Sequence, residues 1–172
     1  MSRKGLIVGR FQPFHFGHLK FIEWVANDVD YLIIGVGSSQ ESHTLENPFS
    51  ASERRDMIKK SLKTRIRYEI VEINDINNDN RWVSHVEEIS PEFDVVYANG
   101  EKEKNLFKNE GYEVKTTPMF NKKQYSGTEI RNRMIDGRPW HDFVPQGTIE
   151  VIERIDGAGR VRRLYESYSY RD

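Results

Sequence analysis

The feature that most limits the fold of this chain is an alternation between short apolar runs and longer segments of helical period. Runs rich in branched and aromatic residues predict strands at 5–9, 31–37, 67–73, 94–98 and 112–117. The intervening segments predict helices at 16–26, 52–62, 81–89 and 102–109. Strands that alternate with helices are typical of βαβ units on a parallel sheet. We therefore expect an α/β fold, a doubly wound parallel sheet of about five strands with helices on both faces.

The segment after the fifth predicted strand changes character. Two closing helices are predicted at 126–135 and 146–155, separated by Pro139 and Pro145, which interrupt helical hydrogen bonding. The "DGAGR" stretch (156–160) predicts a turn, and the remaining tail to residue 172 has no clear place in the pattern. Since no repeat, linker or low-complexity segment divides the chain, we expect a single domain over residues 1–172.

The overall composition excludes several kinds of protein. Lys and Arg total 26 against 27 Asp and Glu, so no general positive field indicates binding to nucleic acid. The absence of cysteine excludes disulfides and thiolate nucleophiles and suits a reducing compartment. No apolar run approaches the roughly 20 residues that a membrane helix needs. We expect a soluble cytoplasmic protein with neither nucleic acid nor membrane as a partner.

The stretch "GRFQPFHFGH" (9–18) places two histidines where the first strand passes into the first helix. His15 and His18 are three residues apart, so they project to one side of the helix start, beside free backbone N–H groups and the positive end of the helix dipole. An anion is favoured at such a place. Gly17 leaves room for a phosphate against the backbone, and Arg10 adds a positive charge.

Two other interpretations of the histidine pair remain open. A zinc site needs at least a third ligand, and His43, His85 and His141 show no recognisable ligand spacing. Alternatively, the pair caps or packs the helix start and binds nothing.

A second candidate phosphate site lies in "YSGTEIRNRM" (125–134). Ser126 and Glu129 have the spacing of a capping box, which alone predicts only a helix start. Arg131, one turn further on, is not needed for capping and could bind phosphate oxygens through its guanidinium. A similar capping spacing at Ser50 and Glu53 is interpreted as structural, with the neighbouring Arg54 and Arg55 as secondary phosphate candidates.

The two motifs together resemble the signature of the nucleotidyltransferase superfamily, His-x-Gly-His at 15–18 and Ser-x-Thr-x-x-Arg at 126–131. Segments 9–19, 33–54, 91–97, 111–134 and 144–155 also look like the archaeal-type nicotinamide-nucleotide adenylyltransferase family. This resemblance implies a Rossmann-like nucleotidyltransferase fold with additional C-terminal helices. It further implies transfer of the adenylyl group of ATP to nicotinamide mononucleotide (NMN), giving NAD and pyrophosphate, with Mg²⁺ and a homo-oligomer, often a hexamer in that family.

The resemblance also implies the site residues. His15, His18 and Arg131 are the expected catalytic residues. The expected ATP-binding residues are Gly9, Arg10, Phe11, His15, Gly17, His18, Ser126, Thr128 and Arg131. Trp82 is expected to stack on nicotinamide in a pocket lined by Asp75, whereas Mg²⁺ is expected to bridge ATP phosphates without a protein metal site. Because the attacking phosphate oxygen is already ionised, no general base is required. The expected reaction is in-line attack without a covalent intermediate.

Several residues depart from the family pattern or have open roles. Ala98-Asn99-Gly100 stands where the family usually has Ser-Gly-Asn, and Glu46 stands where some relatives have arginine. Arg160, Arg162 and Arg163 are expected to be solvated, with a subunit interface as the alternative. Two rival functions remain: nucleotidyl transfer to another phosphorylated acceptor, such as FMN or phosphopantetheine, and nucleotide sensing without turnover.

Overall fold

The computed structural model describes residues 2–120 and 122–171. Its elements in chain order are β1 (Lys4–Gly9), α1 (Phe16–Val25), β2 (Tyr31–Val36), α2 (Ala51–Ser61), β3 (Arg67–Glu72), α3 (Asp79–Ile89), β4 (Val95–Tyr97), α4 (Glu101–Asn109), β5 (Glu113–Lys115), α5 (Gly127–Ile135), η1 (His141–Phe143), α6 (Gln146–Arg154) and α7 (Gly157–Ser169). The predicted strands and the helices predicted up to residue 155 are confirmed, with ends shifted by up to two residues. Within the described part of the chain, no helix is long and apolar enough to cross a membrane.

The chain forms two compact units, each assembled from three separate segments. The sheet unit comprises the residues up to Gly9, Phe21–Ser39 and Thr64–Pro118. The helical unit comprises Arg10–Lys20, Gln40–Lys63 and the described residues from Met119 onward. Because neither unit is continuous in sequence, no single cut in the chain separates them. A single domain over 1–172 stays a prediction.

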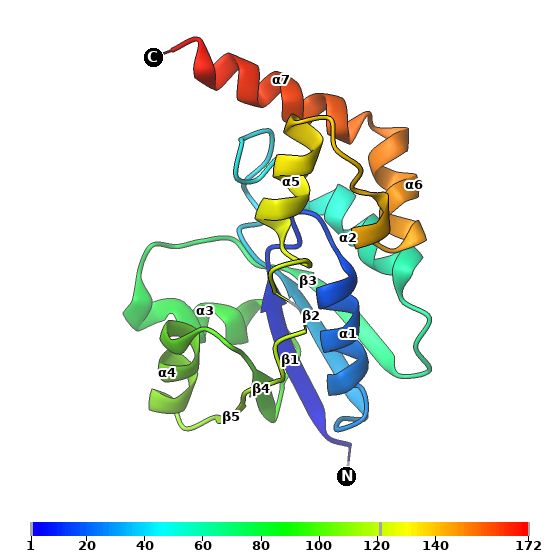
Figure 1. Cartoon of the computed structure of the whole chain (residues 1–172). Helices are drawn as coiled ribbons and strands as arrows, with labels where there is room; N and C mark the ends of the chain where they lie inside the picture. Colours follow the sequence, from blue (N-terminus) through cyan, green and yellow to red (C-terminus); the bar gives the residue numbers. More distant parts are fainter. Residues whose placement is uncertain (1, 121, 172) are drawn as a thin grey trace. The chain divides into compact units, whose positions relative to one another are not determined.

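The sheet unit contains five parallel strands in the order β3-β2-β1-β4-β5 (Figure 1). In its centre Ile7 of β1 pairs with Ile34 of β2 on one side and with Tyr97 of β4 on the other. The order reverses between β1 and β4, which confirms the doubly wound parallel sheet. Ligands of such sheets bind beyond the carboxyl ends of the strands that flank this reversal.

Helices cover both faces of the sheet. Leu6, Ile33 and Val96 lie in one apolar cluster with side chains of α3 and α4, which pack side by side on that face (Figure 1). Successive residues of a strand point to opposite faces. Tyr97 therefore faces the other way, where its ring contacts that of Trp24 in the second half of α1. The central strands are buried because both faces are covered, and their nearly continuous apolar sequences reflect this.

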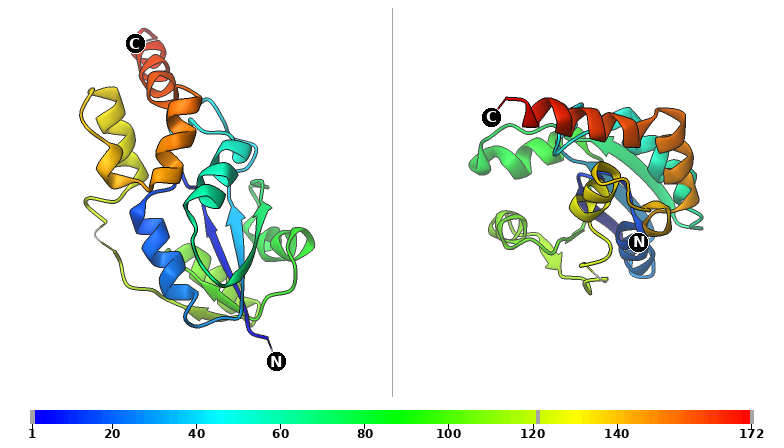
Figure 2. Two further views of the ribbon diagram at one scale, coloured as in Figure 1. Left: turned by 90° about the vertical axis from the view of Figure 1, so that its right-hand side faces the viewer. Right: turned by 45° about the horizontal axis from the view of Figure 1, so that its top comes forward.

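The helical unit is built around α2, α5, α6 and α7 (Figure 2). Helix α2 packs against α6, while α7 packs against α5 and α6. The prediction of a turn at 156–160 is wrong, because Asp156 takes a left-handed conformation (φ 51°) and α7 starts directly after it. A Cβ at Gly157 would lie 2.9 Å from the Phe49 ring, so this glycine permits close packing rather than chain reversal.

Candidate active site

The two histidines of the first motif lie against each other at the start of α1. Their rings stack with centroids 3.6 Å apart and an interplanar angle of 20°. The backbone N–H of His15 donates to Nδ1 of His18 at 3.2 Å, and the backbone N–H of His18 donates to Nδ1 of His15 at 3.3 Å. Since each Nδ1 accepts a hydrogen bond, each neutral ring carries its proton on Nε2. Both rings therefore have an N–H donor left for a phosphate oxygen.

The histidine side chains are neutral at pH 7. His15 is only 6% exposed, and this burial lowers its pKa to about 4. Burial, and to a lesser extent the neighbouring His15, lowers the pKa of His18 well below its ordinary value. The imidazoles thus contribute hydrogen-bond donors, whereas the positive charge of the two motifs comes from their arginines.

We expect the stability of the folded chain to fall between pH 6.5 and pH 4 because of His15. The unfolded chain binds a proton near pH 6.5 and the folded chain only near pH 4, so the unfolded state gains protons first as the pH falls. His15 alone should lower the free energy of unfolding by about 3 kcal/mol across this range. Urea unfolding from pH 4 to 7 should show a flatter pH dependence for His15→Gln than for the wild type.

The control for this pH series is His141→Gln, which removes an exposed imidazole that lies 3.4 Å from Glu153. Its curve shows how far the loss of a histidine outside the motif changes the pH dependence by itself. The variants are compared by the slope of the free energy of unfolding against pH. His15→Gln also changes packing, which shifts its free energy of unfolding at every pH. Parallel curves for His15→Gln and the wild type would contradict the assigned burial of His15.

Gly17 and Phe11 support the histidine pair. A Cβ at Gly17 would lie 2.9 Å from Cε1 of the His15 ring, so the stacked arrangement needs glycine there. The sequence suggested room for phosphate as the reason for this glycine; room for the imidazole is a further one. Phe11 is buried and its backbone is left-handed (φ 55°). Its ring makes an edge contact with the His18 ring, with the two ring centroids 4.8 Å apart. An ATP contact of Phe11 would therefore use its backbone.

The second motif lies beside the first in the helical unit. The Arg131 guanidinium donates to the carbonyl oxygen of Gln12 at 2.8 Å and to Oγ1 of Thr128 at 3.4 Å. Ser126 is the N-cap of α5, and its Oγ accepts from the backbone N–H of Glu129 at 3.1 Å. Residues more than 110 positions apart in the sequence are thus connected by one hydrogen bond.

The arginines of the two motifs affect each other electrostatically. Burial and the charge of Arg10 lower the pKa of Arg131, while Glu46 opposes this shift. An arginine side chain stays protonated at neutral pH, so two guanidinium cations remain close enough to repel each other. A polyanion bound between them would relieve this repulsion and use the Nε2–H donors of the histidines.

Two buried polar residues that hold this arrangement were missed or misjudged from the sequence. Gln12 is 4% exposed; its Nε2 donates to the carbonyl of Phe49 at 2.9 Å, and its Oε1 accepts from the Phe49 N–H at 3.0 Å. Arg54 is fully buried and donates to the carbonyls of Arg10 at 2.8 Å and Ser50 at 3.2 Å. Arg54 thus supports the Arg10 turn, and its secondary assignment to phosphate is wrong. The one sequence feature that could have indicated a structural role for Gln12 is its position as a polar residue between Phe11 and Pro13.

The prediction that Arg160 is solvated is also wrong. Its guanidinium forms a two-pronged ion pair with Glu53, at 2.7 and 2.9 Å, and donates to the carbonyl of Pro48 at 3.0 Å. The Arg160 and Glu53 side chains are only 14% and 16% exposed. Glu53 also completes the capping box of α2 with Ser50, as its sequence spacing predicts. Arg160 thereby ties α7 to the start of α2.

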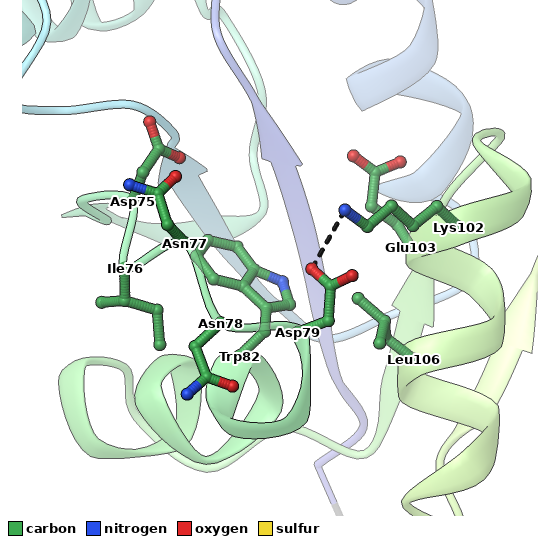
Figure 3. Close-up of a pocket in the computed structure, with 9 residues that line it drawn as sticks. All are labelled: Asp75, Ile76, Asn77, Asn78, Asp79, Trp82, Lys102, Glu103 and Leu106. Atoms are coloured by element: carbon green, nitrogen blue, oxygen red, sulfur yellow. Dashed lines mark ion pairs between the residues drawn. The ribbon is translucent and has the colours of Figure 1, made fainter.

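The residues expected to bind the acceptor line one cavity of the sheet unit. Trp82 and Asp75 belong to a cavity of about 240 Å³ between the segment after β3 and the first turns of α3 and α4 (Figure 3). The other lining residues are Ile76, Asn77, Asn78, Asp79, Lys102, Glu103 and Leu106. Of the residues expected to bind ATP, Gly9 alone belongs to the sheet unit. It is the last residue of β1, and its carbonyl oxygen accepts a hydrogen bond from the backbone N–H of Gly37 at 2.8 Å.

The zinc interpretation finds no support in the described residues. Among residues 2–120 and 122–171, no three histidine or carboxylate side chains gather into a metal-binding group. His85 instead contacts the carbonyl of Asn74 through Nε2 at 3.0 Å.

Comparison with known proteins relates the chain to enzymes of one kind. The sequence model of the cytidylyltransferase-like family matches residues 6–133. A nicotinamide-nucleotide adenylyltransferase of Methanococcus aeolicus is 49% identical over 94% of this chain and 94% of its own. Its counterpart from Thermoplasma acidophilum is 48% identical over 95% of this chain and 92% of its own.

A solved structure shares the fold. The bifunctional NMN adenylyltransferase/ADP ribose pyrophosphatase of Francisella tularensis, crystallised with AMP and a manganese ion, superposes with a TM-score of 0.78 at 19% identity. The superposition covers 99% of this chain and 54% of that protein, so this chain spans about half its length. From the family match and the near-complete alignments above, the chain contains a cytidylyltransferase-like domain and belongs to the nicotinamide-nucleotide adenylyltransferase family.

Proposed function

We propose that this protein joins ATP and NMN to form NAD and pyrophosphate. An oxygen of the NMN phosphate attacks the α-phosphorus of ATP, a new P–O bond forms, and the bond to the β-phosphate oxygen breaks as pyrophosphate leaves. Relatives named for this activity are nearly half identical to the chain over almost its whole length. The structural observation that carries the proposal is the hydrogen bond from Arg131 to the Gln12 carbonyl, because it connects the second motif to the turn that leads into the first.

The residues of the helical unit suit catalysis by electrostatic stabilisation. The reacting phosphates carry like charges, and additional charge develops on the departing pyrophosphate. Preorganised donors and cations lower the barrier for such a step. We assign the Nε2–H groups of His15 and His18 and the guanidinium of Arg131 to this role. The backbone of Gly9, Phe11 and Gly17, the Arg10 side chain and the hydroxyls of Ser126 and Thr128 complete the proposed ATP site.

A divalent cation, which we propose to be Mg²⁺, fits this site as a companion of the triphosphate. Mg²⁺ keeps several waters and usually combines phosphate oxygens with one or two carboxylates. The described residues offer no cluster of three metal-binding side chains, which suits an ion carried by ATP. When bound, the ion would neutralise part of the phosphate charge. Arg10 and Arg131 would then hold the remaining anionic oxygens.

The acceptor half of the proposal places nicotinamide against Trp82, with Asp75 beside it. The nicotinamide ring of NMN is a flat cation, and indole is the aromatic side chain that attracts cations best. Trp82 is half-buried at the cavity, so one part of its ring packs on the apolar cluster of the sheet unit. A fixed ring of this kind can orient the acceptor.

The proposal includes a homo-oligomer, a hexamer in the family pattern, in the cytoplasm and without a nucleic acid partner. Three tyrosines of the C-terminal segment support an interface, because Tyr165, Tyr168 and Tyr170 are 45%, 63% and 90% exposed. Tyrosine is enriched in protein interfaces. Light scattering of the full chain tests the oligomer, and a monomer at all concentrations would exclude it.

The function is tested by assaying pyrophosphate release from ATP with NMN, FMN and phosphopantetheine side by side. We expect turnover with NMN and NAD as the product. The Trp82→Ala variant should raise KM for NMN about tenfold with little change in KM for ATP, since one ring contact is worth about 1–2 kcal/mol. Trp82→Phe, which keeps a ring, should recover part of the loss. ATP or NAD binding without any turnover would instead support a sensor.

A further inference from the structure

The acceptor cavity has an excess of negative charge. Three carboxylates line it, those of Asp75, Asp79 and Glu103. Among the described residues that line the cavity, Lys102 is the one basic side chain. Figure 3 shows these groups around the Trp82 indole, with Asp79 from the first turn of α3 and both Lys102 and Glu103 from the first turn of α4.

The charge of Lys102 is already compensated. Its Nζ lies 3.0 Å from Oδ1 of Asp79, and this ion pair joins α3 to α4 beside the cavity (Figure 3). Glu103, also on α4, lines the same cavity, so α3 and α4 each bring a carboxylate to the cavity that Lys102 lines. A ligand carboxylate entering the cavity would have to compete with Asp79 for Lys102 and would also meet the negative charge of Glu103.

This charge pattern favours one class of pyridine nucleotide over another. Nicotinamide joined to ribose is a pyridinium cation with an uncharged carboxamide, whereas the nicotinic acid analogue carries an additional carboxylate on the same ring. The cation is attracted both by the indole face and by the surrounding carboxylates. The additional carboxylate is repelled by the same groups, and repulsion of the wrong ligand is an effective source of specificity.

We propose that Asp79 and Glu103 select the acceptor. Asp79 forms an ion pair with Lys102, which keeps the ammonium group from binding a ligand carboxylate, and Glu103 adds negative charge to the cavity. Together they favour pyridinium nucleotides whose ring substituent is uncharged. This inference rests on the proposed function, since it assumes that the cavity at Trp82 receives the acceptor ring. It concerns the selection between two acceptors and not the transfer step itself.

The test compares kcat/KM for NMN and for nicotinic acid mononucleotide in the full-length protein. The wild type should prefer NMN at least tenfold. Asp79→Asn removes one carboxylate and releases Lys102, so the preference should fall about fivefold; Glu103→Gln, which removes charge only, should lower it about twofold. Because each preference is a ratio measured on one variant, a partial loss of folded protein cancels.

Glu101→Gln is the matched control. Glu101 lies one residue before Lys102 on the same helix, pairs with Lys104 and lies outside the set of cavity-lining residues. This substitution removes the same charge, and the preference should stay unchanged. High salt should lower the preference of the wild type, because the lining carboxylates are exposed to solvent and their field is screened.

Binding measurements separate this inference from the proposed function. Calorimetric titration of each mononucleotide into the protein reports selection without turnover. If neither acceptor releases pyrophosphate but NMN binds more tightly and Asp79→Asn reduces the difference, the function is wrong and the selection stands. If NAD forms but the wild type treats both acceptors alike, or Asp79→Asn keeps the wild-type preference, the selection is wrong and the function stands.

Discussion

Replacing His18 with alanine should lower kcat about 10²- to 10³-fold and leave KM for NMN nearly unchanged. Three contacts fix the His18 ring and so the direction of its Nε2–H: the hydrogen bond from the His15 backbone N–H to Nδ1, the stacked His15 ring and the edge contact with the Phe11 ring. A preorganised donor to a phosphate oxygen stabilises the transition state most, and losing one such donor typically costs this factor. Steady-state kinetics with NMN and ATP measure the loss.

Two further substitutions distinguish this role from loss of folding. His18→Gln keeps an N–H donor near the position of Nε2 and should recover part of kcat, although it loses the aromatic stack. His141→Gln changes a histidine of the helical unit that pairs with Glu153 on the surface, and it should retain wild-type rates. A fall in kcat of less than fivefold in His18→Ala, with the fold intact by circular dichroism, would remove His18 from the catalytic residues.

Replacing Arg54 with methionine should lower the free energy of unfolding by about 3–5 kcal/mol and the melting temperature by roughly 10 °C. Methionine fills similar space but cannot donate to the carbonyls of Arg10, Ser50 and Glu41, which Arg54 reaches at 2.8, 3.2 and 3.4 Å. The three carbonyl oxygens contact a fully buried side chain, and acceptors left there without a donor retain the cost of their desolvation. Urea unfolding monitored by circular dichroism measures the change.

The Arg54 substitution should also affect turnover, because the Arg10 carbonyl belongs to the turn that precedes the histidine pair. Measured well below the melting temperature, kcat of Arg54→Met should fall while KM for NMN stays close to that of the wild type. Arg54→Lys retains one or two of the hydrogen bonds and should lie between the two proteins. Arg65→Met, at an exposed arginine, should leave both stability and kcat unchanged. Wild-type stability of Arg54→Met would contradict the buried position of this side chain.

Local sequence patterns predicted the sheet well because each strand carries its own signal. The runs at 31–37 and 67–73 contain the branched residues of β2 and β3, and the reversal of strand order beside β1 follows from the way parallel βαβ units wind. Helix α2 was likewise predictable, since Ser50 and Glu53 supply its cap in adjacent sequence.

The failures concern residues whose role depends on distant partners. Gly157 resembles a turn residue in sequence, yet it lies in α7 because Phe49, more than 100 residues earlier, occupies the space of a side chain. Arg160 resembles a solvated charge but meets Glu53 on α2. Neither partner lies within the window of sequence from which a helix or turn is inferred, so no local pattern could reveal them.

The same division applies to the candidate site. The sequence by itself determined which chemistry is present, because the spacing of His15, Gly17 and His18, and of Ser126, Thr128 and Arg131, defines two phosphate-type motifs. Only the tertiary structure decided how they are held together: the Gln12 carbonyl receives Arg131, Gln12 and Arg54 hold the turn from inside, and burial keeps both imidazoles neutral. The physical reason is that donor and acceptor types are properties of single residues, whereas burial, pKa and hydrogen-bond geometry depend on the neighbours that folding supplies.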